Sequence, residues 1–206
     1  MKITIITSCI RPENLPKLYE SIQFEHVKKW IIIYDTSKGQ EYTWSYKKDN
    51  RILEAECHDQ GVVGYAQKNF GLKFVKGGMV YFLDDDTIMH PNFWRFIPMM
   101  NEDTVYLWDQ ESYLYIPQTA FGTFTEIDEN LAAQKRTQDP SILKADIIHC
   151  TKIHLGMFMI PYKYINLHFI PHIYLSAGIF ITSIYEEDTS KCAYIPYVLS
   201  YGKLIC

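Results

Sequence analysis

The chain has 206 residues, of which 48% are hydrophobic and 21% charged, so its composition is that of a globular protein with one sizeable core. Its formal net charge of −4 and the lack of any Lys/Arg block in the sequence exclude a typical nucleic-acid-binding protein. Five cysteines without CxxC spacing indicate reduced thiols rather than a disulfide framework or a zinc site.

No stretch of the sequence approaches the ~20 apolar residues that a membrane span needs. The apolar opening, Ile3 to Ile10, is interrupted by Arg11-Pro12 without a small-residue cleavage site. We therefore interpret it as a first strand rather than a signal peptide, and we expect a cytoplasmic protein.

The first half of the chain alternates between strand and helix patterns. β-branched runs buried on both faces are typical of parallel strands, and a proline suits the first turn of a helix. The pattern predicts, in order, strand Lys2–Thr7, helix Pro12–Ile22, strand Trp30–Tyr34, strand Arg51–Glu56, helix Ala66–Phe74 and strand Met79–Leu83. This order favours a mostly parallel sheet with helices on its faces.

The strand Met79–Leu83 stops abruptly in three consecutive carboxylates, Asp84, Asp85 and Asp86. Parallel strands of α/β sheets present ligand-binding residues at their carboxyl ends. Three adjacent anions raise one another's pKa unless a cation is present. Mg²⁺ and Mn²⁺ prefer carboxylate oxygen, so the pattern indicates a divalent cation site, although a solvated acidic turn is the common alternative.

The second half gives weaker signals, and no repeat or linker divides it from the first. A short helix is predicted at Pro91–Met100, and a polar, turn-rich stretch at Glu126–Pro140 predicts a mobile loop. Ile173–Ile184 fits either a helix or a strand. The remaining predicted strands are Thr104–Trp108, Tyr113–Ile116, Asp146–His149, Leu155–Ile160 and Ala193–Leu199.

Residues 3–91 resemble the nucleotide-sugar domain of GT-A glycosyltransferases. The likeness rests on the ordered block Gly61-x-x-Gly64-x-Ala66-x-Lys68-Asn69-x-Gly71-Leu72, then Gly77-Gly78, then Tyr81-Phe82-Leu83-Asp84-Asp85-Asp86, which is similar to the family's DXD run. The resemblance implies an α/β, Rossmann-like GT-A fold: a three-layer sandwich with a mostly parallel central sheet. It also implies a single catalytic domain, 1–206, with a nucleotide-binding half at 1–91 and an acceptor-binding half at 92–206.

The resemblance assigns roles to residues near the strand ends. Thr7 and Arg11 would hold the nucleotide, and Asp35 would accept the uracil N–H. Lys68 stands where the family usually has Arg, so a phosphate contact is implied there. Asn69 would bridge the nucleotide loop and the acidic loop. The plainer alternatives are a surface Arg11, a turn-capping Asp35 and an interior Asn69 bonded to a carbonyl.

In the same comparison, Asp84 would bond the ribose hydroxyls or join the metal site, and Asp86 would ligate the Mn²⁺ or Mg²⁺ that bridges the diphosphate. Asp85 could share either task. The implied reaction is the metal-dependent, inverting transfer of a sugar from a UDP-sugar to a hydroxyl of a glycan or other acceptor. Such transfer passes through an oxocarbenium-like transition state.

An inverting enzyme of this kind needs a carboxylate base, which the family often carries in a late xED motif. Tyr185-Glu186-Glu187-Asp188 is similar to it, which implies Asp188 as the base, with Glu187 second; an exposed helix end is the alternative. The family often adds a late histidine to the metal site, but the sequence has none beyond His172.

Two other functions remain open. A haloacid-dehalogenase-like phosphatase also carries Asp-x-Asp after a strand, as in Asp84-x-Asp86, but that strand normally opens its domain. A non-catalytic nucleotide-sugar or glycan-binding protein would keep the fold and lose the metal site, against which the intact Asp84 and Asp86 count.

Overall fold

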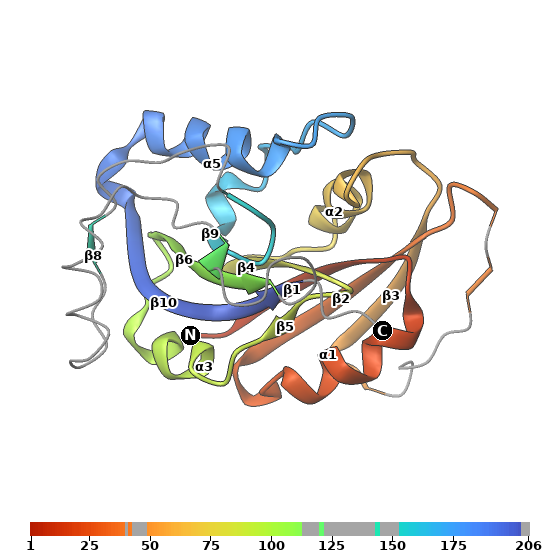
Figure 1. Cartoon of the computed structure of the whole chain (residues 1–206), viewed down its shortest axis with the longest axis horizontal. Helices are drawn as coiled ribbons and strands as arrows, with labels where there is room; N and C mark the ends of the chain where they lie inside the picture. Colours follow the sequence, from red (N-terminus) through yellow and green to blue (C-terminus); the bar gives the residue numbers. More distant parts are fainter. Residues whose placement is uncertain (40, 43–48, 113–119, 122–142, 145–152, 203–206) are drawn as a thin grey trace.

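The structure is a computed structural model that describes residues 1–39, 41–42, 49–112, 120–121, 143–144 and 153–202. Its strands join one mixed sheet in the order β3-β2-β1-β4-β9-β6-β10-β5, with β7 paired to β6 and β8 to β10 (Figure 1). The strands predicted at 113–116 and 146–149, and the loop predicted at 126–140, lie outside the described residues.

The first half forms the parallel part of this sheet, as the alternating pattern predicts. Every residue of the first strand is buried, because it lies between two parallel neighbours and its β-branched side chains fill both faces. The strands are β1 (Ile3–Cys9), β2 (Val27–Asp35), β3 (Ile52–Cys57) and β4 (Met79–Asp84). The predicted helix at Pro12 begins as a 3-10 turn, η1 (Pro12–Asn14), and continues as α1 (Leu15–Ser21).

The second half extends the same sheet and adds antiparallel pairs. Its elements are β5 (Ile88–Met89), α3 (Phe93–Phe96), β6 (Val105–Ser112), β7 (Ala120–Phe121), β8 (Leu143–Lys144), β9 (Phe158–Pro161), α5 (Ser176–Glu187) and β10 (Cys192–Gly202). Strand β9 runs antiparallel to both β4 and β6. Consequently β4 and β6 point the same way, and their carboxyl ends reach the same edge of the sheet.

Helices cover both faces of the sheet, so the fold has three layers (Figure 1). On one face, α1 and α3 pack over the aromatic side chains of Trp30, Tyr81 and Trp108. On the other, α2 (Tyr65–Leu72) and α5 pack over Phe82 and Phe158. The expected α/β three-layer arrangement is confirmed. Among the described residues, no helix has both the length and the hydrophobicity to cross a bilayer.

Thr7, a predicted nucleotide contact, belongs to the core instead. Its side chain is fully buried, and its Oγ1 accepts a hydrogen bond of 2.9 Å from the indole Nε1 of Trp30. Strand alternation explains the placement: Thr7 points to the α1 face, whereas its neighbour Ser8 lines the cavity described below. The structure therefore shows a core role for the Thr7 side chain, and its assignment to the nucleotide site stays a prediction.

Replacing Thr7 by Val should destabilise the protein without changing its affinity for nucleotides. The valine leaves the buried Trp30 N–H without an acceptor, a loss of about 1–3 kcal/mol in the free energy of unfolding. Chemical denaturation measures that loss, and Thr7→Ser, which keeps the hydroxyl, should recover most of it. If Thr7→Val kept its stability and bound nucleotides more weakly, Thr7 would have to be assigned to the nucleotide site.

Candidate active site

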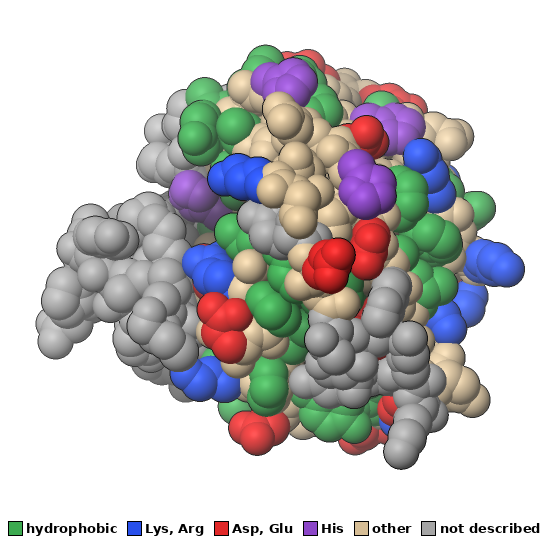
Figure 2. Space-filling view, turned by 90° about the vertical axis from the view of Figure 1, so that its right-hand side faces the viewer, with side chains coloured by type: hydrophobic (Ala, Val, Ile, Leu, Met, Phe, Trp, Pro, Cys, Tyr) green, Lys and Arg blue, Asp and Glu red, His purple; other side chains and the backbone are tan. Residues whose placement is uncertain are grey.

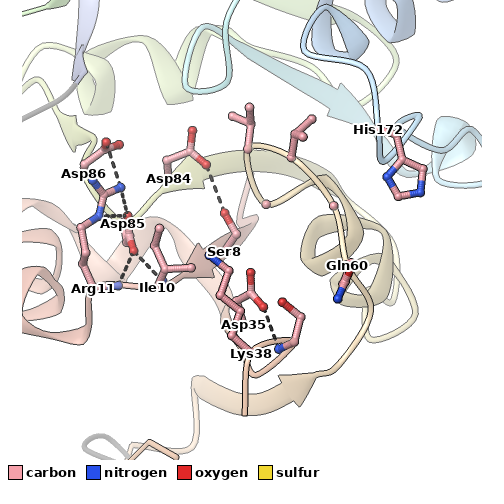
Figure 3. Close-up of a pocket in the computed structure, with 15 residues that line it drawn as sticks. Ser8, Ile10, Arg11, Asp35, Lys38, Gln60, Asp84, Asp85, Asp86 and His172 are labelled. Atoms are coloured by element: carbon pink, nitrogen blue, oxygen red, sulfur yellow. Dashed lines mark hydrogen bonds and ion pairs between the residues drawn. The ribbon is translucent and has the colours of Figure 1, made fainter. Parts of the chain in front are cut away.

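A cavity of about 680 Å³ lies at the edge of the sheet where the parallel strands end, the usual ligand site of open α/β sheets. Figure 2 looks onto this side of the molecule, where acidic side chains gather near the middle of the face. The cavity is lined from the loops after β1, β2 and β4, from the turn before α2, and from residue His172 of the second half (Figure 3).

The middle aspartate of the acidic loop is a structural residue. Asp85 is 1% exposed, and its Oδ2 accepts hydrogen bonds of 2.7 Å from the backbone N–H groups of both Ile10 and Arg11. Its Oδ1 accepts from Arg11 Nε at 3.1 Å and Nη2 at 2.5 Å. All of its bonding capacity is directed at the loop after β1, so we expect no ligand contact from Asp85.

Lys68 fixes the first aspartate from behind the cavity. Its side chain is fully buried, and Nζ donates to Asp84 Oδ1 at 2.5 Å, Ser8 Oγ at 2.6 Å and Val63 O at 3.2 Å. Because an ammonium group has three donors, none remains for a phosphate. The expected phosphate contact is therefore not made in this arrangement; Lys68 neutralises and orients Asp84 instead.

The turn before α2 packs so closely on this network that it requires glycine. Gly64 has a φ of +67°, and a Cβ there would lie 2.2 Å from Ser8 Oγ and 3.1 Å from Lys68 Nζ. The preceding residue, Val63, also has a positive φ of 53°, which is rare for a β-branched side chain. The hydrogen bond from Lys68 to the Val63 carbonyl holds the turn in this conformation.

Asp35 reaches the cavity from the end of β2. Its Oδ1 accepts a hydrogen bond of 2.9 Å from Ser37 N, which caps the following turn. Its Oδ2 has no partner among the described residues. The two interpretations of Asp35 are thus compatible, since one oxygen closes the turn and the other is available to a ligand.

Among the described residues, the side chain of Asp86 has one partner, Arg11, whose Nη2 lies 2.9 Å from Asp86 Oδ2. Burial, followed by the negative charge of Asp84, raises the pKa of Asp86 above its ordinary value, although Arg11 opposes the rise. Burial and the nearby negative charge therefore disfavour the ionised form of Asp86. Within the described residues, Asp86 Oδ1 and Asp84 Oδ2 accept no hydrogen bond.

These two carboxylate oxygens suit a hard divalent cation. No group of three or more His, Cys, Asp and Glu side chains is arranged to hold a metal among the described residues. Mg²⁺, however, is commonly bound by one or two carboxylates, with water and substrate phosphates completing its shell. The donor set of Asp84 and Asp86 fits such an ion.

Asn69, expected to bridge the nucleotide and acidic loops, binds a different segment. Its Nδ2 donates to Phe169 O at 2.8 Å, and its Oδ1 accepts from Phe169 N at 2.9 Å. Two further bonds join α2 and its turn to this segment: Val62 N to Pro171 O at 2.7 Å and Tyr65 OH to Tyr174 O at 2.9 Å. These contacts match the plainer alternative, an interior Asn69 bonded to a carbonyl, and the bridging role stays a prediction.

The segment held by Asn69 places His172 on the cavity wall across from the acidic loop (Figure 3). The sequence did not mark His172 as a site residue, because no motif surrounds it. Ser8 was missed for a similar reason, since a serine at a strand end is common. The pairing of Phe169 with a helix 100 residues earlier is a tertiary contact that the local sequence does not encode.

Glu187 and Asp188 do not reach the cavity. His172 lies just before α5, whereas these two residues stand at the opposite end of that 12-residue helix, about 18 Å further on (Figure 1). Asp188 Oδ1 accepts from Ser190 N at 3.0 Å and Ser190 Oγ at 2.6 Å, and the hydroxyl bond lowers the pKa of Asp188. In this structure Asp188 caps a turn, which corrects its assignment as the base, with Glu187 as second choice.

Solved structures share this fold over nearly the whole chain. The crystal structure of S. aureus TarS 1-349 matches 98% of this chain and 60% of that chain at 12% identity, with a TM-score of 0.67. Its complex with UDP gives 0.66 at 12% identity over the same shares. The complex with UDP-GlcNAc gives 0.63 at 14% identity, covering 98% of this chain and 58% of that chain.

These likenesses show the fold, which is the Rossmann-like GT-A arrangement, and the chain spans about 60% of the length of the TarS chains. No protein-family model and no curated protein matches the sequence.

Gly64→Ala should disturb both stability and the site. The added Cβ meets Ser8 and Lys68, and alanine is strained at positive φ, so we expect a loss of about 1–3 kcal/mol in the free energy of unfolding together with weakened ligand binding. Gly77→Ala is the matched control: its φ is +86°, but nothing lies within 4 Å of the added Cβ. Equal losses in the two variants would show that the contact with Ser8 is unimportant.

Proposed function

We propose that the protein is a metal-dependent glycosyltransferase that uses a nucleoside-diphosphate sugar, most simply a UDP-sugar, as donor. The observation that carries the proposal is the pair of available carboxylate oxygens, on Asp84 and Asp86, at the carboxyl edge of a GT-A sheet. The structures of similar fold that were solved with UDP and UDP-GlcNAc support a nucleotide-sugar donor.

The proposed donor lies across the strand ends from β2 to β4. Asp35 Oδ2 accepts the N3–H of uracil, and Arg11 lies on the cavity wall beside Asp85 and Asp86. Asp84 accepts from the ribose hydroxyls or joins Asp86 in holding Mn²⁺ or Mg²⁺ against the diphosphate. When bound, the cation supplies Lewis-acid stabilisation of the negative charge on the departing diphosphate.

The residues of this chain orient the donor by holding the charged side chains around it in fixed positions. Lys68 and Ser8 hold Asp84 in one rotamer, and Asp85 fixes the loop that carries Arg11. Such preorganisation removes the cost of reorientation during the reaction. The acceptor would approach over residues 170–175, where Ile173, Tyr174 and Leu175 are exposed beside His172.

For an inverting transfer, the base must come from a residue other than Asp188. Asp109 is fully buried and accepts a hydrogen bond of 2.7 Å from Tyr194 OH, which makes it unsuitable. Glu111 stands near the end of β6, in register with Tyr201 of β10, on the same edge of the sheet as the acidic loop. We therefore expect the base of an inverting transfer to come from this edge of the sheet.

A thermal-shift panel tests the donor class. UDP with Mn²⁺ at about 100 times the dissociation constant should add about 2.7 kcal/mol to the free energy of unfolding. UDP without the cation should add much less. Asp86→Asn should abolish the dependence on Mn²⁺ and leave the free protein about as stable at neutral pH, because burial disfavours the ionised carboxylate of Asp86.

The same panel separates the alternatives. Release of phosphate from p-nitrophenyl phosphate, without stabilisation by UDP, would favour a haloacid-dehalogenase-like phosphatase. Stabilisation by UDP-sugars with neither hydrolysis nor transfer across an acceptor screen would indicate a binding protein. A null response to every nucleotide, with and without Mn²⁺, contradicts the proposed function.

Asp35→Ala tests recognition of the base. Loss of a hydrogen bond to a charged acceptor should weaken UDP by roughly 1.5–3 kcal/mol in calorimetry. CDP is the control ligand. Because cytosine has no N3–H, the affinity for CDP should change far less, and the ratio of UDP affinity to CDP affinity should fall in the variant. Equal weakening of UDP and CDP would assign Asp35 to turn capping alone.

A further inference from the structure

Arg11 is bound to two aspartates of unequal character. Nη2 lies 2.5 Å from Asp85 Oδ1 and 2.9 Å from Asp86 Oδ2, and the side chains of Asp85 and Asp86 are 2% and 17% exposed. We propose that Arg11 is the built-in counter-ion of Asp86, which opposes binding of a divalent cation alone and makes cation and nucleoside diphosphate bind cooperatively. The inference rests on the proposed function for the identity of the second ligand.

The link between Arg11 and Asp85 is the permanent one. Asp85 also holds the backbone N–H groups of Ile10 and Arg11, and a buried carboxylate that lost its cation would be strongly destabilised. Asp86, by contrast, has no partner but Arg11 among the described residues. Arg11 can therefore release Asp86 while it remains on Asp85.

The charges explain why the release needs an anion. Three carboxylates face two cations, since Lys68 neutralises Asp84 and Arg11 serves Asp85 and Asp86. A divalent cation at Asp86 would then lie beside the guanidinium, and the two would repel each other. A diphosphate offsets both charges and gives Arg11 a new acceptor.

Arg11 has a donor ready for that acceptor. Its Nη1 makes no hydrogen bond to any described residue, and its side chain is 30% exposed at the cavity wall. Guanidinium groups bind phosphate in a forked geometry. Each ligand thus removes an obstacle to the other, which is the reciprocal coupling expected of linked sites.

Mn²⁺ binding to the whole chain, followed by the electron paramagnetic resonance signal of free Mn²⁺, tests the inference with and without UDP. Wild type should bind Mn²⁺ weakly alone and at least about 10-fold more tightly with UDP, within the usual range of coupling. Arg11→Gln should bind Mn²⁺ alone about 10-fold more tightly than wild type, and UDP should add little.

Two further variants serve as controls. Arg51→Gln breaks a similar pair, with Arg51 Nη2 2.8 Å from Asp49 Oδ2, but outside the cavity lining, so Mn²⁺ binding should not change. The double variant Arg11→Gln with Asp85→Asn removes the buried charge that Arg11→Gln would strand. The double variant has the same net charge as wild type. A gain in its Mn²⁺ affinity would therefore come from the loss of the ion pair between Arg11 and Asp86.

Equal Mn²⁺ affinity of wild type and both Arg11 variants, without nucleotide, overturns the counter-ion role. So does tight Mn²⁺ binding by wild type alone with no further gain from UDP. A gain in both Arg11 variants, in a protein that ignores UDP, keeps the counter-ion role and rejects the nucleotide. Failure of the inference and failure of the proposed function are therefore distinguishable.

Discussion

The bonds of Asp85 to the loop after β1 are the constraint on which the rest of the site depends. β1 and β4 are parallel neighbours in the sheet, with Ser8 opposite Asp84 in register, but the backbone ladder stops where the strands end. Beyond that point the buried carboxylate of Asp85 joins the two loops, because it accepts hydrogen bonds from two backbone N–H groups and from the guanidinium of Arg11. Without it, the two loops that carry the charged residues would have no fixed relation to each other.

Gly156, in the second half of the chain, supports the strand that leads to the acidic loop. Gly156 N donates to Phe82 O just before the aspartates, and the Gly156 carbonyl accepts from Tyr81 OH, Trp108 Nε1 and Ser200 Oγ. Its φ is +88°, and a Cβ would lie 2.6 Å from Gln110 Nε2. Three strands thus converge on one peptide group, which couples β4 to β6 and β10 beside the cavity.

Sequence periodicity predicted the parallel strands and the helix before Asp84 because burial on both faces and helical spacing leave local signals. The acidic loop and Asp35 were likewise predictable from their position after apolar strands. The contacts of Thr7, Lys68 and Asn69 were not predictable, because they depend on which face of an element each residue occupies and on partners far along the chain. Burial of Lys68, in particular, follows from Gly64 and Ser8 packing over it. His172 depends on a segment held by α2, so its place could be known only from the tertiary structure.

The three adjacent aspartates are not equivalent, and their order follows from the geometry of a strand end. Strand β4 ends at Asp84, and Asp85 and Asp86 lie in the turn closed by the hydrogen bond from Thr87 N to Asp84 O, so the three side chains leave the backbone in different directions. Asp84 meets Lys68 from the α2 face, while Asp85 turns to the loop after β1. Asp86 is the last to emerge and has the fewest protein partners. A motif of the same length with an uncharged residue between the two acids could supply the same pair of oxygens, but here the middle carboxylate holds the arginine that balances the third.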